Sequence, residues 1–227
     1  IDTTIVIMAG GRGKRLMPLT SKMPKPMLEV SGKPILEHIL LNAKKQGFKN
    51  FMISVNYLSD TIKKYFGSGE NIGINISYIE EKTPLGTIGS IKIAEKKLSS
   101  RFIVIYSDLI TNIDLSKFLK YHIKNNAAAS MAIRPYEWTN PFGVVRLDGL
   151  KIKSFQEKPV KKININAGVY IFEPEAFKFI ENNEYIDAPT LFERLKKNEK
   201  KIIAYPLYET WLDIGRVEDY KNAKEIK

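Results

Sequence analysis

The sequence predicts an α/β protein in which a doubly wound, mixed but mostly parallel sheet carries helices on both faces. Apolar runs in the first half of the chain are continuous rather than alternating, as in strands that are buried on both faces. Between these runs lie longer segments with apolar side chains at helical spacing. Strands and helices therefore alternate as they do in βαβ units, whose crossovers build a parallel sheet.

The first half of the chain supplies this parallel core. A buried strand at 5–9 ends at Gly10-Gly11, and a loop rich in glycine, proline and basic residues follows to about Pro34. Gly47 and Gly67 stand where they would close two of the helices. The remaining expected elements are helix 35–46, strand 51–55, helix 58–66, strand 74–79, helix 88–98, strand 102–106 and helix 115–124.

In the second half of the chain, strands separated by short turns replace the alternation of strands and helices. Strands are expected at 128–134, 143–147, 151–156 and 167–172, with Asp148-Gly149 as a hairpin turn. Helices return at 174–181, 188–197 and 217–226. No linker and no internal repeat interrupts the chain, so we expect residues 1–227 to form a single Rossmann-like domain. Its ligand should bind beyond the carboxyl ends of the strands.

Composition excludes several classes of protein. The chain has 227 residues, is 44% hydrophobic and 27% charged, and has no cysteine and two histidines. Disulfides, iron–sulfur clusters, thiol nucleophiles and multi-histidine metal centres are thereby excluded, and any metal must be held by oxygen ligands. No apolar run approaches the ~20 residues of a membrane span, and no secretory signal is visible, so we expect a cytoplasmic protein without membrane partners.

The net charge of +11 suits an anionic ligand, although most lysines are expected on solvated faces. No basic-aromatic repeat or recognition motif indicates nucleic-acid binding. The chain begins at Ile1 rather than Met, so we expect that it was excised from a longer protein.

The loop Gly10–Leu16 is the densest candidate motif. Its glycines would let backbone N–H groups approach a phosphate, and its basic residues would neutralise the charge. It is not a Walker A loop, because Arg15 follows Gly13-Lys14 and no glycine stands at position 8. It is not a dinucleotide-binding loop either, because Leu16 occupies the third glycine position. An ordinary glycine-rich turn is the alternative.

Lys25 lies between two prolines, which stiffen the backbone on either side of it. Such stiffness is useful where an ammonium group must be aimed in advance at developing phosphate charge. A stiff surface turn is the alternative interpretation.

Two aspartates follow expected strand ends. Asp108 comes after strand 102–106, and Asp213 follows Trp211-Leu212. Two carboxylates near a triphosphate would hold Mg²⁺, which prefers one or two carboxylates together with phosphate oxygens and waters. Alternatively, each aspartate could cap the segment that follows it.

Read in order, these blocks resemble the sugar-1-phosphate nucleotidylyltransferases, also called NDP-sugar pyrophosphorylases. The resemblance runs from the first strand to Gly215 and implies the nucleotide-diphospho-sugar transferase fold. It is nearest to the mannose-1-phosphate guanylyltransferase-like branch, often fused to N-terminal cystathionine-β-synthase-type domains. Further matching blocks are Pro84-Leu85-Gly86-Thr87, Ser107-Asp108, Phe142-Gly143-Val144, Glu157-Lys158-Pro159, Asn166-Ala167-Gly168 and Trp211-Leu212-Asp213-Ile214-Gly215.

The resemblance implies a role for each matching residue. Residues 1–125 or so would form the nucleotide-binding half and 126–227 the sugar-phosphate half. Arg15 and Lys25 would be catalytic, and Asp108 and Asp213 would hold Mg²⁺. Nucleotide contacts would come from Met8, Gly10, Gly11, Gly13, Glu81, Gly86 and Thr87. Sugar-phosphate contacts would come from Gly143, Glu157, Lys158 and Asn166.

The expected partners are a nucleoside triphosphate and a sugar 1-phosphate. Glu81 stands about where related enzymes read the base, and a carboxylate only accepts hydrogen bonds. Guanine offers two adjacent donors, so GTP is favoured over UTP or dTTP, although Glu80 or a backbone carbonyl could read the base instead. Mannose, amino-hexose and heptose phosphates stay open. A homo-oligomer, an N-terminal regulatory domain in the full-length chain and a catalytically silent nucleotide-sugar-binding module also stay open.

Overall fold

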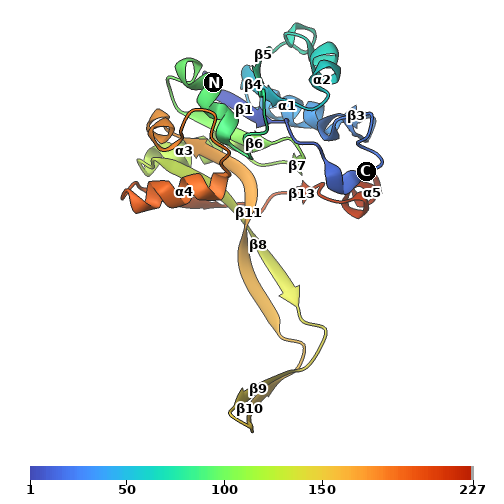
Figure 1. The fold of residues 1–227 in the computed structure, drawn as a ribbon, viewed down its shortest axis with the longest axis vertical. Coiled ribbons are helices and arrows are strands. Elements are labelled where there is room, and N and C mark those ends of the chain that lie inside the picture. Colours follow the sequence, from blue (N-terminus) through green and yellow to red (C-terminus); the bar gives the residue numbers. More distant parts are fainter. Residues whose placement is uncertain (226–227) are drawn as a thin grey trace.

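The centre of the computed structural model, which describes residues 1–225, is a seven-stranded sheet in the order β12-β8-β11-β6-β1-β4-β5 (Figure 1). Neighbouring strands pair in parallel except around β11, which is antiparallel to β6 and β8. The expected doubly wound, mostly parallel sheet is therefore confirmed. Its strands are β1 (Thr4–Met8), β4 (Asn50–Val55), β5 (Asn75–Glu80), β6 (Phe102–Tyr106), β8 (Ala129–Thr139), β11 (Val160–Phe172) and β12 (Ile202–Pro206).

The continuous apolar runs of the central strands serve two cores, one on each face of the sheet. Along β1, Ile5 and Ile7 belong to one core while Val6 belongs to the other, because successive side chains of a strand point to opposite faces. The first core is covered by α1 (Ile35–Lys45), α2 (Ser59–Phe66) and α3 (Leu115–Lys124). The second is covered by α4 (Ala188–Lys197) and the 3₁₀ helices η4 (Gly89–Lys97) and η5 (Pro174–Phe179).

Several elements differ from the sequence predictions. The expected helices 88–98 and 174–181 are the 3₁₀ helices η4 and η5. The three-residue strand β13 (Trp211–Asp213) agrees with the strand end expected at Trp211-Leu212, whereas β12 and the three-residue strand β7 (Leu109–Thr111) were not expected. Runs this short carry too little periodicity to be recognised. Helix α5 (Val217–Glu225) matches the expected helix 217–226 as far as the described residues go, and residue 226 lies outside them.

A long β-ribbon, residues 134–166, projects from the body, and we call it the arm (Figure 1). Strands β8 and β11 run on beyond the sheet, and β9 (Val144–Asp148) and β10 (Lys151–Gln156) form the tip around the expected Asp148-Gly149 turn. The arm leaves from the carboxyl end of β8, which is the same edge at which β1 and β6 end. It exposes Tyr136, Trp138, Phe142, Val145, Leu147, Leu150, Ile152, Phe155, Val160 and Ile163.

A third, smaller apolar cluster fastens the C-terminal segment to the loop after β1. Its buried members are Leu16, Leu28, Val30, Ile35, Ile214, Tyr220 and Ala223. The Tyr220 hydroxyl also donates a hydrogen bond of 2.8 Å to the Glu29 carbonyl, next to the short hairpin of β2 (Glu29–Val30) and β3 (Lys33–Pro34). This cluster brings residues far apart in the sequence to one edge of the sheet. Within residues 1–225, no helix has the length and apolar character required to cross a membrane.

A buried polar group lies at the opposite end of the sheet. The fully buried His122 ring makes a 2.7 Å hydrogen bond to the Ser130 hydroxyl through Nδ1 and approaches Glu173 Oε1 at 3.3 Å through Nε2. Arg101 also pairs with that carboxylate, at 3.1 Å. Burial lowers the pKa of His122, and the smaller attraction of Glu173 opposes the change. The folded protein therefore disfavours the imidazolium form of this ring.

We expect the free energy of unfolding to fall as the pH drops below about 6.5, the ordinary pKa of histidine. In that range the unfolded chain binds a proton at His122 that the folded chain resists. Chemical denaturation of wild type and His122→Gln between pH 7.5 and pH 5.5 measures the effect. The variant should lose part of the pH dependence, and equal slopes for the two proteins would contradict this account.

Candidate active site

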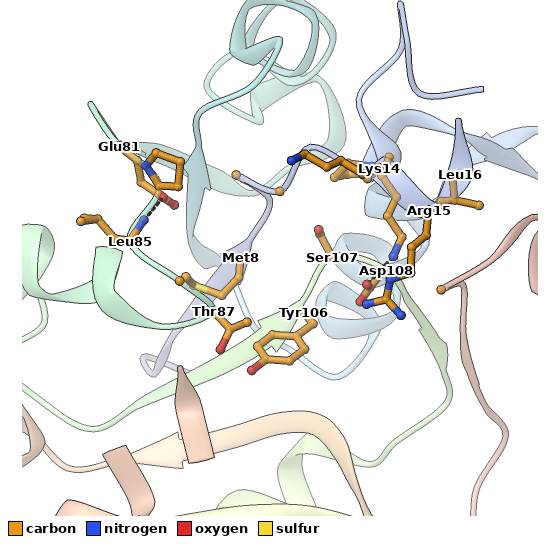
Figure 2. A pocket seen from close by; sticks show the side chains of 18 of the residues that line it. Met8, Lys14, Arg15, Leu16, Glu81, Leu85, Thr87, Tyr106, Ser107 and Asp108 are labelled. Carbon is orange, nitrogen blue, oxygen red and sulfur yellow. Dashed lines mark hydrogen bonds and ion pairs between the residues drawn. The ribbon is translucent and has the colours of Figure 1, made fainter. Parts of the chain in front are cut away.

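A pocket of about 400 Å³ lies at the carboxyl ends of β1, β5 and β6, the edge at which the sequence placed the ligand. Four loops form it: the glycine-rich loop after β1, the segment around Lys25, the loop after β5 and the turn after β6 (Figure 2). Its lining includes ten residues singled out from the sequence, namely Met8, Gly10, Gly11, Gly13, Arg15, Lys25, Glu81, Gly86, Thr87 and Asp108. Their common location is established by the structure, and their individual roles stay predictions.

The two ends of this pocket differ in character. Figure 2 shows Arg15 and Asp108 at one end and Glu81 and Leu85 at the other, with Thr87 between them. We call the first the charged end and the second the Glu81 end. A ligand with a highly charged part and a less charged part would fit this division.

An ion pair defines the charged end. Lys25 Nζ lies 2.5 Å from Asp108 Oδ2, and the two side chains are 14% and 27% exposed. The pair joins the loop after β1 to the end of β6, two segments that are 83 residues apart in sequence. Pro24 and Pro26 flank Lys25 in the short 3₁₀ helix at Lys25–Met27 and stiffen the backbone that carries this ammonium.

Asp213 lies beside this pair, although it is not part of the pocket lining. Strand β13 pairs with β7 so that Asp213 is opposite Leu109, and Ile214 N–H donates a 2.9 Å hydrogen bond to the Asp108 carbonyl. Burial raises the pKa of Asp213, the like charge of Asp108 adds to this, and Lys25 and Arg15 oppose it.

These residues fit a hydrated divalent cation. Among residues 1–225 no cluster of three or more acidic or histidine side chains could hold a metal ion, so the protein would contribute two carboxylates at most. Mg²⁺ is commonly bound by one or two carboxylates and completes its shell with waters and substrate phosphates. A cation between Asp108 and Asp213 would also relieve the repulsion that raises the pKa of Asp213.

The glycine-rich loop can pack against Lys25 because Gly13 has no side chain. Its φ of +60° is in the left-handed region, and an added Cβ would lie 3.0 Å from Thr20 Cγ2 and 3.1 Å from Lys25 Cβ. Thr20 closes the loop by donating a 2.9 Å hydrogen bond to the Gly13 carbonyl. The loop is therefore folded around the lysine rather than placed independently of it.

Glu81 lies in the pocket with both carboxylate oxygens already engaged. Oε1 accepts a 2.6 Å hydrogen bond from the Ser54 hydroxyl, and Oε2 accepts a 3.2 Å bond from Leu85 N–H. A Cβ at Gly10 would come within 2.7 Å of Glu81 Oε1, so a larger residue there would require this carboxylate to shift. Each oxygen keeps further lone-pair capacity, which leaves Glu81 able to accept from a ligand.

The loop after β5 rests on a platform that sequence reasoning missed, residues 184–188. Thr87 N–H donates to Asp187 Oδ1 at 2.8 Å, and Ala188 N–H donates to the Thr87 hydroxyl at 3.0 Å. Gly86 has a φ of +80°, and a Cβ there would lie 2.5 Å from the Ile186 carbonyl oxygen. Lys14 also lines the pocket as part of the glycine-rich loop whose basic residues the sequence singled out. Tyr106 and Tyr185 line it too, and neither was singled out from the sequence.

The expected sugar-phosphate residues are not brought into the pocket. Gly143, Glu157 and Lys158 lie on the arm, where Lys158 has a φ of +40° at the corner between the two ribbons. Asn166 lies at the base of the arm, outside the lining. Its amide donates to the Tyr170 hydroxyl at 2.6 Å, and its oxygen accepts from Gly168 N–H at 2.9 Å. The structure thus assembles the expected nucleotide half and leaves the expected sugar half apart from it.

Several named proteins are similar in sequence to this chain over nearly its whole length. The chain is 32% identical to the UTP–glucose-1-phosphate uridylyltransferase of Synechocystis sp. (96% of this chain, 61% of the relative). It is 34% identical to the mannose-1-phosphate guanyltransferase of Yarrowia lipolytica (95% and 61%). It is 33% identical to the D-glycero-alpha-D-manno-heptose 1-phosphate guanylyltransferase of Aneurinibacillus thermoaerophilus (97% and 96%). The chain therefore spans about 61% of the length of the first two relatives.

Solved structures agree with this likeness. HddC from Yersinia pseudotuberculosis superposes with a TM-score of 0.76 at 28% identity over 98% of both chains, and a complex of it with GMP-PN is similar to the same extent. The sequence profile of the family described as nucleotidyl transferase matches residues 4–226. The glycine-rich loop, the lysine–aspartate pair and the second aspartate lie at one sheet edge, as described above. On the basis of these comparisons, the chain belongs to the nucleotidyl transferase family, among the sugar-1-phosphate nucleotidyltransferases.

Proposed function

We propose that the chain transfers a nucleotidyl group from a nucleoside triphosphate to a sugar 1-phosphate. An oxygen of the sugar phosphate attacks the α-phosphorus in line, the new P–O bond forms, and the bond to the β-phosphate oxygen breaks. The products are an NDP-sugar and pyrophosphate. The attacking phosphate is already anionic at neutral pH, so the reaction needs neither a protein nucleophile nor a strong general base. The obstacle is the mutual repulsion of two polyanions.

The Lys25–Asp108 pair at the charged end is the observation that supports this proposal most directly. It places a partly buried ammonium beside the turn after β6, with Arg15 in the same pocket. In the proposed complex Lys25 moves from Asp108 to the α-phosphate, where negative charge grows, and Arg15 faces the departing pyrophosphate. Once the substrates are bound, a cation already held at the α-phosphate is effective because it needs no further reorganisation while the charge develops. Positioning of the two substrates supplies much of the remaining acceleration.

Asp108 and Asp213 would hold Mg²⁺ in this scheme. The ion would neutralise phosphate charge and orient the triphosphate against the glycine-rich loop. Its binding would also free Lys25, because Asp108 would exchange an ammonium partner for a divalent one.

For the base, we propose guanine. Glu81 is a carboxylate at the less charged end of the pocket, and its unused lone pairs suit the two adjacent donors of guanine. The relatives include guanylyl- and uridylyltransferases, and the HddC complex carries the GMP-PN named in its title. Uridylyl or thymidylyl transfer is the alternative within this fold.

For the sugar phosphate, we propose that the arm completes the site by bending toward the body. Lys158 lies two residues before β11 and eight residues from Asn166, about 26 Å if the segment is fully extended. Two features at which the ribbon departs from regular pairing flank this stretch: the register shift between Asn166 and Tyr170, and the left-handed Lys158. An isolated two-stranded ribbon is marginally stable in water, and bending would cover its apolar side chains. Mannose, amino-hexose and heptose 1-phosphates are the candidate substrates.

With Mg²⁺ present, we expect pyrophosphate release when GTP and a sugar 1-phosphate are supplied together. The measurement is a panel of GTP, UTP, dTTP, CTP and ATP, each with mannose, glucose and heptose 1-phosphates, with products identified by mass. GTP should give the highest kcat/KM. Faster turnover with UTP or dTTP would reject the guanine assignment, and no turnover in any mixture would favour a silent binding module.

Lys25→Ala should lower kcat by a factor of about 10² to 10³, the size of effect seen when one donor to developing charge is removed. Lys22→Ala, an exposed lysine of the same loop, is the matched control and should keep near wild-type kcat. Thermal melts of both variants establish that they are folded. A loss of less than fivefold in Lys25→Ala would contradict the role given to this ammonium.

Lys158→Ala should raise the KM for the sugar 1-phosphate at least tenfold and leave the KM for the nucleotide within twofold. The reason is that its proposed contact is with the incoming phosphate alone. Lys161→Ala removes an equal charge from the same arm and serves as the control. Identical kinetics of the two variants would show that the arm lysine at 158 has no part in substrate binding.

A further inference from the structure

The N-terminus of α4 is capped from another part of the chain. Asp187 is the residue before this helix, a position at which an aspartate ordinarily accepts a hydrogen bond from the first helical turn. Its side chain makes no such bond, and Oδ1 accepts instead from Thr87 N–H at 2.8 Å, 100 residues away in the sequence. The carboxylate is therefore used by the loop that lines the active-site pocket rather than by its own helix.

The contact is reciprocal. Ala188 N–H, the first donor of α4, gives a 3.0 Å hydrogen bond to the Thr87 hydroxyl, and Pro189, the next residue, has no N–H. Thr87 thus caps the helix, while Asp187 holds the backbone of Thr87. We call these two hydrogen bonds the reciprocal cap.

Two backbone hydrogen bonds extend the reciprocal cap on both sides. Ile186 N–H donates to the Leu85 carbonyl at 3.1 Å, and Ile88 N–H donates to the Ile186 carbonyl at 3.2 Å. The amides of Leu85 and Thr87 are engaged as well, so in this stretch only Gly86 N–H has no partner within the described part of the chain. Because Gly86 lines the pocket, its amide is available to a ligand.

The platform itself is fixed to the body through α4. Arg194 of this helix pairs with both oxygens of the Glu184 carboxylate and donates a 2.9 Å hydrogen bond to the Phe179 carbonyl. Leu191 and Leu195 of the same helix are fully buried in the second core. The packing of α4 therefore sets the position of the loop after β5.

We propose that Asp187 is a positioning residue for the nucleotide, and that the reciprocal cap holds Gly86 and Thr87 in the bound conformation before the nucleotide arrives. This inference rests on the proposed function. Figure 2 shows Thr87 between the charged end and the Glu81 end, so the cap acts on the part of the nucleotide beyond the phosphates. Asp187 is not part of the pocket lining, and its effect passes through the loop. A loop that is already ordered loses less conformational freedom on binding, which raises affinity.

Nucleotide binding by four variants separates the geometry of this contact from its charge. Asp187→Ala removes the acceptor, Asp187→Glu keeps the charge but displaces the acceptor by one methylene, and Asp187→Asn keeps an acceptor oxygen without the charge. Asp114→Ala is the matched control, because Asp114 precedes α3 and accepts a hydrogen bond of the same 2.8 Å length from Lys117 N–H of its own helix. GTP, UTP and inorganic tripolyphosphate, which lacks the nucleoside, are titrated by calorimetry with Mg²⁺ present.

We expect Asp187→Ala to weaken binding of the nucleotide that wild type prefers at least tenfold, and binding of tripolyphosphate less than twofold. Asp187→Glu should weaken nucleotide binding at least threefold, whereas Asp187→Asn should stay within twofold of wild type. Asp114→Ala should lower the melting temperature without altering either affinity. In turnover, Asp187→Ala should raise the KM for the nucleotide and leave the KM for the sugar 1-phosphate within twofold.

Equal losses of nucleotide and tripolyphosphate affinity in Asp187→Ala would overturn the inference, and so would an Asp187→Asn variant as impaired as Asp187→Ala. Melting curves establish that the variants are folded. If Asp187→Ala does not fold, Asp187→Glu and Asp187→Asn decide, and equal nucleotide affinities of these two would overturn the positioning role. A wild-type chain that binds neither nucleotide contradicts the proposed function and this inference together. A wild-type chain that transfers a nucleotide which Asp187→Ala binds equally tightly contradicts this inference alone.

Discussion

The contact between Lys25 and Asp108 is the constraint around which the active-site edge is organised. It joins the loop that follows β1 to the turn that follows β6. Gly13 lacks a side chain where the loop folds over Lys25, and Asp213 is held beside the pair by the β7–β13 ladder. The charged groups Lys25, Asp108 and Asp213 lie close together, so the charge state of each depends on the others. A polyanionic substrate and a divalent cation would each exchange for one partner of this pair.

The sequence predicted the scaffold well because its signal is local. The uninterrupted apolar run of β1 and the helical spacing of apolar residues in α1 predict that these elements are buried. The glycines and basic residues of the loop after β1 indicate that it binds an anion. What the sequence could not supply was convergence over long separations. The pairing of Asp213 with Leu109 links two three-residue strands, neither of which has a recognisable period. Asp187 and the Ile186 carbonyl meet Gly86 and Thr87 only in the folded chain, and no pattern near residue 187 marks it as a support for that loop.

The sugar half shows the other limit of sequence reasoning. A sequence motif indicates which residues a family has in common. It does not predict the conformation of the segment that contains them. Gly143, Glu157 and Lys158 were expected beside the nucleotide and lie instead on an extended ribbon. According to their names, the relatives act on glucose, mannose and heptose phosphates, and they differ in the nucleotide as well. The family motif alone therefore does not predict where this chain holds its sugar-phosphate residues.

The double engagement of Glu81 has a consequence for anyone who wishes to redesign the choice of base. Both neighbours, the Ser54 hydroxyl and Leu85 N–H, donate to it, so each needs an acceptor. Glutamine has one acceptor oxygen, and if its NH₂ faced Leu85 N–H that donor would be left unsatisfied, at a typical cost of about 1–3 kcal/mol. Facing Ser54 instead, the NH₂ could donate to the hydroxyl, which has Ser90 Oγ at 2.7 Å as another acceptor. A substitution at Glu81 would therefore also act on the loop at residues 81–85, and single-site libraries would combine any change in base preference with a change in this loop.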